Sequence, residues 1–166
     1  MKTLKKVLLV MLVLGLCVGC DQASKVVARN HLALSPPIYV MGDILRLHYT
    51  ENTGAFLGLG ASLSESVRFW SFVVFVSGVL VGFLGFLLFS QALNPLGWWG
   101  GTLVVGGGLS NLIDRILNNG AVIDFMNVGI GNLRTGVFNV ADVAIMVGMG
   151  ILLVSTLSLN PKKENV

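Results

Sequence analysis

Three aspartates, Asp114, Asp124 and Asp142, could do chemistry because each lies in or beside strongly apolar sequence. An ionised carboxylate is costly to bury unless neighbouring groups compensate for its lost hydration. Asp142 has a structural explanation as a negative charge near the start of a helix, and Asp114 has one as a partner for the adjacent Arg115. Asp124 has neither, since apolar residues on both sides would desolvate it.

Two carboxylates brought together in an apolar site define a specific kind of chemistry. They cannot easily both ionise, so one keeps a proton and acts as an acid while the other takes a proton from water. Such a pair can hydrolyse an amide bond without a metal or a covalent intermediate. A purely structural role for the same acids remains the alternative at this point.

Other catalytic signatures are missing, so we expect no metal site and no cofactor. The sequence contains no H-E-x-x-H motif, and its two histidines, His31 and His48, have no evident partners. The pair Cys17 and Cys20 has the C-x-x-C spacing of redox motifs. A quinone-linked relay would need a second cysteine pair, and the chain has only 2 cysteines.

The composition indicates that these acids belong to a membrane protein. Of the 166 residues, 54% are hydrophobic and only 11% are charged, whereas soluble domains carry about 25% charged residues. The net charge of +3 comes with lysines near both ends of the chain. No basic stripe with interleaved aromatic residues lies between them, so a nucleic-acid partner is not expected.

We expect an all-α membrane protein with four transmembrane helices. No charged residue lies between Arg68 and Asp114, and this stretch is long enough for two spans of about 20 residues. Polar residues and a proline at Gln91–Pro95 divide it. In the first span, Asp21 and Lys25 are four residues apart and can pair on one helix face. The predicted spans are approximately 7–28, 69–89, 96–113 and 138–159.

The beginning of the chain allows a different interpretation. Lysines followed by the apolar run Val7–Cys20 are typical of a cleaved lipoprotein signal peptide, with Cys20 as the lipidated new terminus. We favour an uncleaved first span, because Cys17 occupies a position where such signals prefer leucine. Cleavage would also discard a helix that ends in a useful ion pair.

The predicted topology places the acids at one membrane surface. Basic residues at both ends favour cytoplasmic termini by the positive-inside rule, so the charged residues outside the two tails fall at the outer edge of the bilayer. The outer segment, approximately 30–67, contains two short strand patterns around the turn signal Gly42-Asp43. We therefore expect a small extracytoplasmic β-rich segment between the first two helices, within a single integral membrane domain, 1–166. The glycine-rich stretch Ala55–Gly60 is a candidate lip over the site.

Five sequence blocks, in order, resemble lipoprotein signal peptidase, also called signal peptidase II, an aspartic peptidase family of the bacterial inner membrane. The blocks are Asp21-Gln22-Ala23-Ser24-Lys25, Asn52-Thr53-Gly54-Ala55-Phe56, residues 106–115 ending in Asn111-Leu112-Ile113-Asp114-Arg115, Val122-Ile123-Asp124-Phe125, and Phe138-Asn139-Val140-Ala141-Asp142. Any one block is a weak signal, but five in the right order with four spans are specific.

The resemblance implies a function and a set of site residues. Asp124 and Asp142 would be the catalytic pair of an endopeptidase that removes signal peptides from diacylglyceryl-modified prolipoproteins. The supporting residues would be Asp21, Lys25, Asn52, Gly54, Asn111, Asp114, Arg115, Asn139 and Ala141. Prolipoproteins and membrane lipid would be the partners of a monomeric enzyme whose site lies near the outer, periplasmic surface.

The chain departs from the family pattern at several positions. Gly108 stands where the family usually has alanine, Ser110 where it usually has glycine, and Val143 where serine is common. These differences bear on substrate preference more than on chemistry. The competing interpretation is a small non-enzymatic membrane protein, such as a transporter subunit or an assembly factor, that uses the same acids as structural ion pairs.

Overall fold

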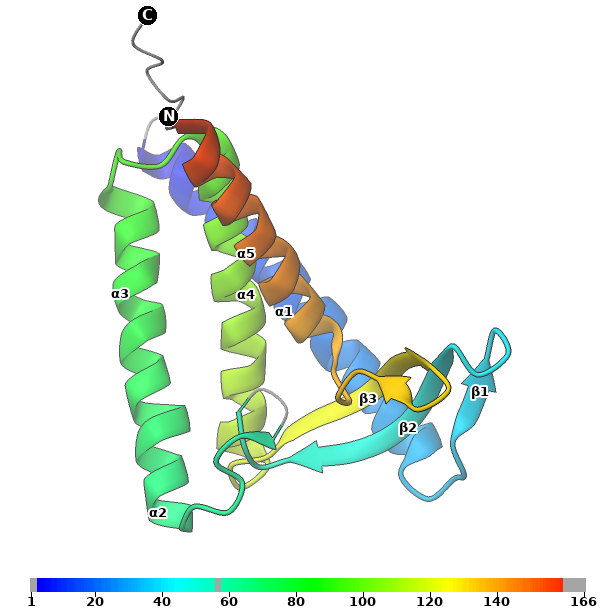
Figure 1. Cartoon of the computed structure of the whole chain (residues 1–166). Helices are drawn as coiled ribbons and strands as arrows, with labels where there is room; N and C mark the ends of the chain where they lie inside the picture. Colours follow the sequence, from blue (N-terminus) through cyan, green and yellow to red (C-terminus); the bar gives the residue numbers. More distant parts are fainter. Residues whose placement is uncertain (1–2, 56–57, 160–166) are drawn as a thin grey trace, which may run out of the picture.

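The computed structural model describes residues 3–55 and 58–159, and it consists of long helices with a small sheet beside one end of them (Figure 1). The helical elements are α1 (Thr3–Leu32), α2 (Glu65–Arg68), the π-helical η2 (Phe69–Phe75), α3 (Val76–Phe89), α4 (Pro95–Leu117) and α5 (Val140–Leu159). The strands are β1 (Ile38–Val40), β2 (Leu45–Asn52), β3 (Val122–Ile130) and β4 (Leu133–Arg134).

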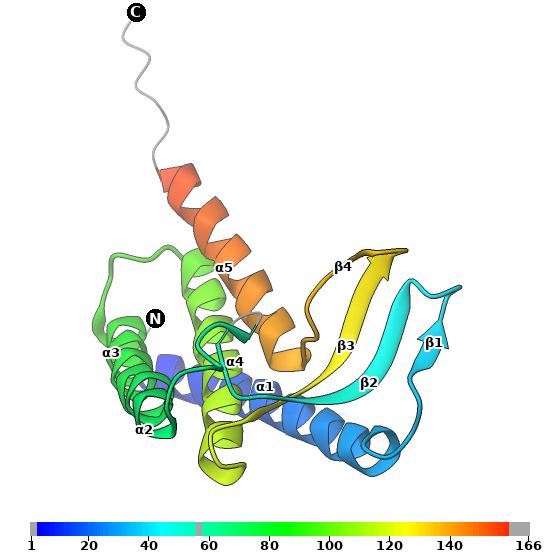
Figure 2. The same ribbon diagram turned by 60° about the horizontal axis from the view of Figure 1, so that its bottom comes forward.

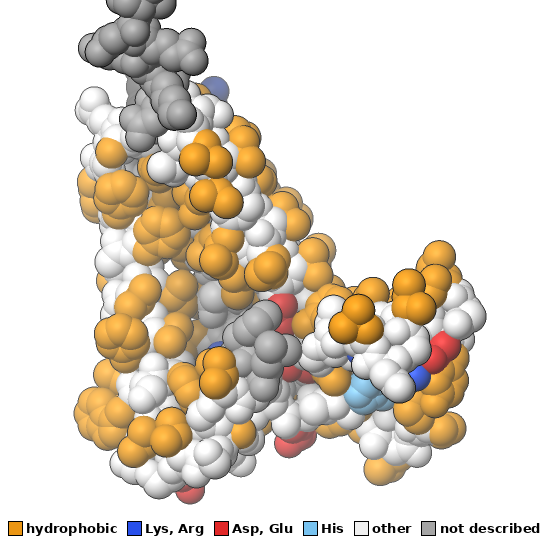
Figure 3. All heavy atoms as spheres, in the orientation of Figure 1, with side chains coloured by type: hydrophobic (Ala, Val, Ile, Leu, Met, Phe, Trp, Pro, Cys, Tyr) orange, Lys and Arg blue, Asp and Glu red, His pale blue; other side chains and the backbone are white. Residues whose placement is uncertain are grey.

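Three helical stretches of the described residues are long and apolar enough to cross a membrane: Leu4–Leu32, Glu65–Phe89 and Val140–Ser158. The second joins α2, η2 and α3 into one continuous helix that begins four residues before the predicted range 69–89. On the face shown in Figure 3, hydrophobic side chains cover the length of the helices, and acidic side chains appear only toward the end beside the sheet. The chain is therefore a membrane protein.

Helix α4 contains the predicted span 96–113 but does not reach the same average hydropathy as the other three stretches. Polar residues such as Ser110, Asn111 and Asp114 lower the hydropathy of α4. These side chains are buried in the protein interior. Its buried face is therefore polar and glycine-rich rather than purely apolar.

Glycines allow α4 and α5 to lie in close contact. A side chain at Gly148 of α5 would place its Cβ 2.6 Å from the carbonyl oxygen of Gly100 in α4. A Cβ at Gly107 would collide with the backbone oxygen of Ala141 and approach Ile145 to 2.8 Å. Small residues on facing positions are a common way for helices to pack within membranes. This contact brings the polar end of α4 against the start of α5.

The sheet is antiparallel, with strand order β1-β2-β3-β4, and it curves beside the end of α1 (Figure 2). The sequence predicted strand structure only between the first two helices. The structure adds β3 and β4 from the connection between α4 and α5, where the register pairs Thr50 with Asp124 and Asn52 with Val122. The first five residues of β3 are nearly all buried, so burial does not alternate along this part of the strand. Helices α1 and α4 pack against β3, and a strand covered on both faces lacks the usual alternation of polar and apolar residues.

Parts of the sequence predictions lie outside the described residues. The terminal lysines Lys2, Lys162 and Lys163, on which the predicted orientation depends, are among them. The candidate lip Ala55–Gly60 includes Phe56 and Leu57, which are also not described.

Candidate active site

Asp124 and Asp142 line one cavity of about 680 Å³ between the helices and the sheet. Asp124 comes from β3 and is 2% exposed, whereas Asp142 lies in the first turn of α5 and is half-buried. Other polar residues of the cavity include Asn52, Asn111 and Arg115, and most of its wall is apolar. The structure therefore brings together two acids that are distant in sequence and belong to different elements.

Asn139 contacts both acids. Its amide nitrogen donates a hydrogen bond to Oδ1 of Asp124 at 2.7 Å, and its backbone N–H donates to Oδ2 of Asp142 at 3.1 Å. The backbone N–H of Asp142 donates in return to the side-chain oxygen of Asn139 at 2.9 Å. This reciprocal pair has the form of a helix capping box, so the start of α5 is stabilised by the same residues that hold the acids.

The remaining carboxylate oxygens each accept a hydrogen bond from a neutral side-chain amide. Asn52 donates to Oδ2 of Asp124 at 3.1 Å, and Asn111 donates to Oδ1 of Asp142 at 2.9 Å. The oxygen of Asn52 accepts from the backbone N–H of Gly54 at 3.0 Å, which fixes its amide orientation. Neither acid is thus held by an ion pair with lysine or arginine in the described structure.

The environment of Asp124 favours its protonated form. Burial and, next in size, the nearby charge of Asp142 together raise the pKa of Asp124 to about 6, against the opposing effect of the hydrogen bonds from Asn52 and Asn139. A carboxyl group with a pKa in this range can hold or release a proton near neutral pH, as acid–base catalysis requires.

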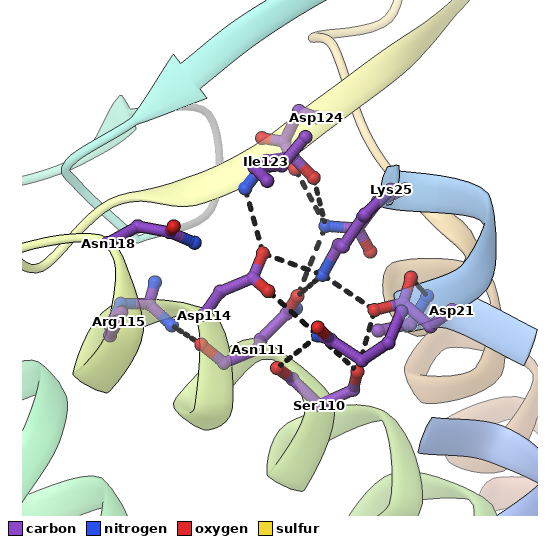
Figure 4. Close-up of polar contacts among 12 residues, drawn as sticks. Asp21, Lys25, Ser110, Asn111, Asp114, Arg115, Asn118, Ile123 and Asp124 are labelled. Carbon is purple, nitrogen blue, oxygen red and sulfur yellow. Dashed lines mark hydrogen bonds and ion pairs between the residues drawn. The ribbon is translucent and has the colours of Figure 1, made fainter. Parts of the chain in front are cut away.

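A second polar network lies directly behind the acids, centred on Lys25 (Figure 4). The Lys25 ammonium is 1% exposed and lies 2.6 Å from Asp21 and 3.0 Å from Asp114. It also donates to the side-chain oxygen of Asn111 at 3.0 Å. Because lysine has only donors, it orients the Asn111 oxygen toward itself and so directs the Asn111 amide nitrogen to Asp142.

Asp21 connects this network to the beginning of α5. Its Oδ1 accepts a hydrogen bond from the backbone N–H of Ala141 at 2.8 Å, and its Oδ2 accepts from the Ser110 hydroxyl at 2.7 Å. Asp114 similarly holds β3, since its Oδ2 accepts from the backbone N–H of Ile123 at 2.9 Å. The two buried acids therefore attach α1 and α4 to the two elements that carry Asp124 and Asp142.

Arg115 does not pair with its neighbour Asp114, which was the structural explanation offered for that acid. One guanidinium nitrogen of Arg115 donates to the backbone oxygen of Gly54 at 2.9 Å, and another donates to the backbone oxygen of Asn111 at 3.4 Å. The guanidinium also lies 5.6 Å from the ring centroid of Phe72. Its buried Nε has no hydrogen-bond partner among the described residues.

The structure adds site residues that sequence reasoning missed. Gln22 donates to Oδ1 of Asp114 at 2.7 Å and to the Ser110 hydroxyl at 3.1 Å. The position of Gln22, one residue from Asp21 in the first block, was the available signal. Arg134 also lines the cavity, while its guanidinium donates to Asn127 and to the backbone oxygen of Asp43.

Among the described residues, no group of three or more histidine, cysteine, aspartate or glutamate side chains could hold a metal ion. Cys17 and Cys20 both carry free thiols. The chemistry that the cavity itself offers is acid–base chemistry at two carboxyl groups.

Known proteins are similar to this chain in sequence. The chain matches the family model described as "Signal peptidase (SPase) II" over residues 13–158. It is 35% identical to a lipoprotein signal peptidase of Leifsonia xyli over 90% of this chain and 68% of that protein. It is 35% identical to one of Syntrophotalea carbinolica over 89% of both chains, and 31% identical to one of Treponema denticola over 86% of this chain and 87% of that protein.

A solved structure supports the fold independently. The chain superposes with a TM-score of 0.78 on a bacterial membrane enzyme solved by the in meso method at 2.3 Å, covering 95% of this chain and 93% of that one at 24% sequence identity. The family match spans the elements that supply every residue of the two networks. On this evidence the chain belongs to the signal peptidase II family and is a peptidase.

Proposed function

We propose that the protein removes signal peptides from diacylglyceryl-modified prolipoproteins, cleaving the bond before the lipidated cysteine. The observation that carries this proposal is the pair Asp124 and Asp142, held by the single residue Asn139 in a largely apolar cavity. An apolar wall beside membrane helices suits a substrate whose acyl chains remain in the bilayer. The relatives' shared name gives independent support for the substrate class.

Asp124 and Asp142 act as the catalytic pair on one water molecule. The ionised carboxylate takes a proton from the water, whose oxygen attacks the scissile carbonyl carbon, while the protonated carboxyl gives its proton to the carbonyl oxygen. The carboxyl group that took the water proton then gives it to the leaving nitrogen as the C–N bond breaks, and a hydroxyl of the tetrahedral intermediate returns its proton to the other carboxylate, which leaves a carboxylic acid, an amine and the original pair. Because the pair titrates as a unit, we assign the proton to the pair rather than to one member.

Arg115 is the supporting residue best placed to contact the substrate. Its side chain lines the cavity, and its buried Nε lacks a partner in the described part of the chain. A substrate carbonyl in the cavity could accept a charge-assisted hydrogen bond from this guanidinium group. Lys25, Asp21 and Asp114 are more deeply buried, so we assign them to positioning the catalytic elements.

We further propose that α4 is a fourth membrane span and that both termini are cytoplasmic. The 23 residues of α4 extend over roughly 34 Å at about 1.5 Å per residue, enough for the hydrocarbon core. Its polar residues face other helices rather than lipid. With four spans and cytoplasmic termini, the ends of the helices that carry the aspartates lie at the outer, periplasmic surface of the inner membrane. We also propose that the enzyme is a monomer.

The direct test is cleavage of a purified lipidated prolipoprotein by the variants Asp124→Asn and Asp142→Asn. Each substitution keeps the side-chain shape and removes the ability to exchange a proton, so each should lower the cleavage rate by about 10²–10⁴-fold or more. Glu51→Gln is the matched control, since Glu51 is an exposed acid next to Asn52 that does not line the cavity. Cleavage at the normal rate by either aspartate variant would refute the proposed pair.

The competing idea of a non-enzymatic transporter subunit or assembly factor is not favoured. Asp21, Lys25 and Asp114 do form a structural ion-pair network, as that idea requires. However, the network leaves Asp124 and Asp142 outside its ion pairs and inside a cavity. The family match is to peptidases.

A further inference from the structure

A second cavity, of about 540 Å³, lies at the opposite end of α4 from the aspartates. It is formed where the start of α1, the end of α3 and the start of α4 meet, and its wall includes Lys6, Phe89, Gln91, Pro95, Trp98 and Trp99. Its volume falls within the range of about 300–1,000 Å³ that is usual for small-molecule sites. Nothing in the proposed peptidase chemistry uses this cavity.

Lys6 brings a positive charge to the cavity. Its ammonium donates one hydrogen bond, to the backbone oxygen of Ser90 at 3.3 Å, which leaves two further donors. The side chain is half-buried, and the described residues contain no acidic partner for it. A partly desolvated ammonium without a counter-ion favours an anionic ligand.

Two tryptophans contribute to the apolar part of the wall. The indole N–H of Trp98 donates to the backbone oxygen of Leu87 at 3.1 Å, so its ring is fixed in place. Trp99 meets it edge to face with ring centroids 4.9 Å apart, and is 40% exposed. Tryptophan is enriched at the level of lipid headgroups because its ring is apolar and its N–H is polar.

We propose that this cavity binds the headgroup of an anionic phospholipid, with Lys6 contacting the phosphate diester and Trp99 contacting the adjoining glycerol and first acyl carbons. Basic pockets between transmembrane helices are a recurring way to bind acidic lipid headgroups. Phe89 also lines the cavity and is 79% exposed, so its apolar side chain is available to contact acyl chains. The site is independent of signal peptide cleavage.

The test uses the native tryptophans as reporters of the bound lipid. The chain has 3 tryptophans, and Trp70 lies far away in η2, so Trp70→Phe leaves only the two cavity residues. The full-length variant is placed in phosphatidylcholine vesicles with a minor fraction of brominated phosphatidylglycerol, or the same fraction of brominated phosphatidylcholine. We expect the anionic lipid to quench with about fivefold higher apparent affinity.

Neighbouring lysines provide matched variants. In the same background, Lys6→Gln should abolish the preference for the anionic lipid and Lys6→Arg should retain it. Lys5→Gln should also retain it, because Lys5 is exposed and does not line the cavity. Equal quenching by the two lipids, or equal loss in Lys5→Gln and Lys6→Gln, would overturn the proposal. Displacement by inorganic phosphate, beyond the effect of chloride at equal ionic strength, would instead make the site one for free phosphate.

Discussion

Asn139 shows how a local structural rule and a catalytic requirement can be met by one side chain. Asn139 is the residue before α5, and its side-chain oxygen accepts a hydrogen bond from the backbone N–H of Asp142. The Asp142 carboxylate in turn accepts one from the backbone N–H of Asn139. The amide nitrogen of Asn139 is thereby left to contact Asp124 and Asn111. The structural explanation of Asp142 as an acid at a helix start is thus correct, and it coexists with the position of Asp142 in the cavity.

The raised pKa of Asp124 leads to a pH-dependent effect on stability. In the folded protein this group holds its proton to about pH 6, whereas in the unfolded chain it loses the proton near its ordinary value of about 3.9. Between these values the folded state binds more protons, so the contribution of Asp124 to the free energy of unfolding falls as pH rises.

We therefore expect Asp124→Asn to gain stability relative to the wild type as pH increases. The difference between their free energies of unfolding should grow by about 2–3 kcal/mol from about pH 4 to pH 7.5. Denaturant unfolding in detergent micelles at a series of pH values measures this difference. A constant difference across the series would mean that the pKa of Asp124 is not raised in the folded protein.

At the scale of elements, the contact between α4 and α5 sets the geometry of the site. Asn111 reaches Asp142 across this contact, and Gly107 lies one helical turn earlier, against Ala141. A methyl group at Gly107 would collide with backbone rather than with a flexible side chain, so the two helices would have to separate. The start of α5 would then move away from α4.

Gly107→Ala should consequently lower the free energy of unfolding by about 1–3 kcal/mol and reduce cleavage of the lipidated substrate. Gly150→Ala is the control, because a Cβ at Gly150, which lies in α5, meets nothing within 4 Å. It should leave activity unchanged and stabilise slightly through its higher helix propensity. Thermal unfolding and cleavage rates measured side by side test both; equal behaviour of the two variants would contradict a tight α4–α5 contact.

At the scale of the whole molecule, the proposed topology puts Leu34 and Gln91 on opposite sides of the membrane. Both are exposed, Leu34 after α1 and Gln91 before α4. In a background with Cys17 and Cys20 replaced by alanine, Leu34→Cys should react with an impermeant maleimide added to spheroplasts. Gln91→Cys should react only after the membrane is opened. Labelling of Gln91→Cys in intact spheroplasts would contradict four spans with cytoplasmic termini.

The sequence alone determined the helices, the candidate acids and the family. Long apolar stretches specify helices because a chain in lipid must satisfy its backbone hydrogen bonds internally, and the ordered motifs carry the family resemblance. It also predicted the pairing of Asp21 with Lys25, which the structure confirms at 2.6 Å. That contact is local, four residues apart on one helix, so spacing is enough to find it.

Only the tertiary structure decided which distant groups meet. Pairing with the adjacent Arg115 was the structural alternative for Asp114, yet Asp114 pairs with Lys25 from another helix. β3, which was not predicted, pairs with β2 in a sheet whose two predicted strands lie more than 60 residues earlier. Ser110 and Gln22 also belong to the buried network around Lys25. These outcomes depend on how closely α1, α4, α5 and the sheet approach one another. Sequence spacing cannot predict these contacts, because buried polar groups need protein partners only once packing has excluded water, and the available partners depend on which elements pack together.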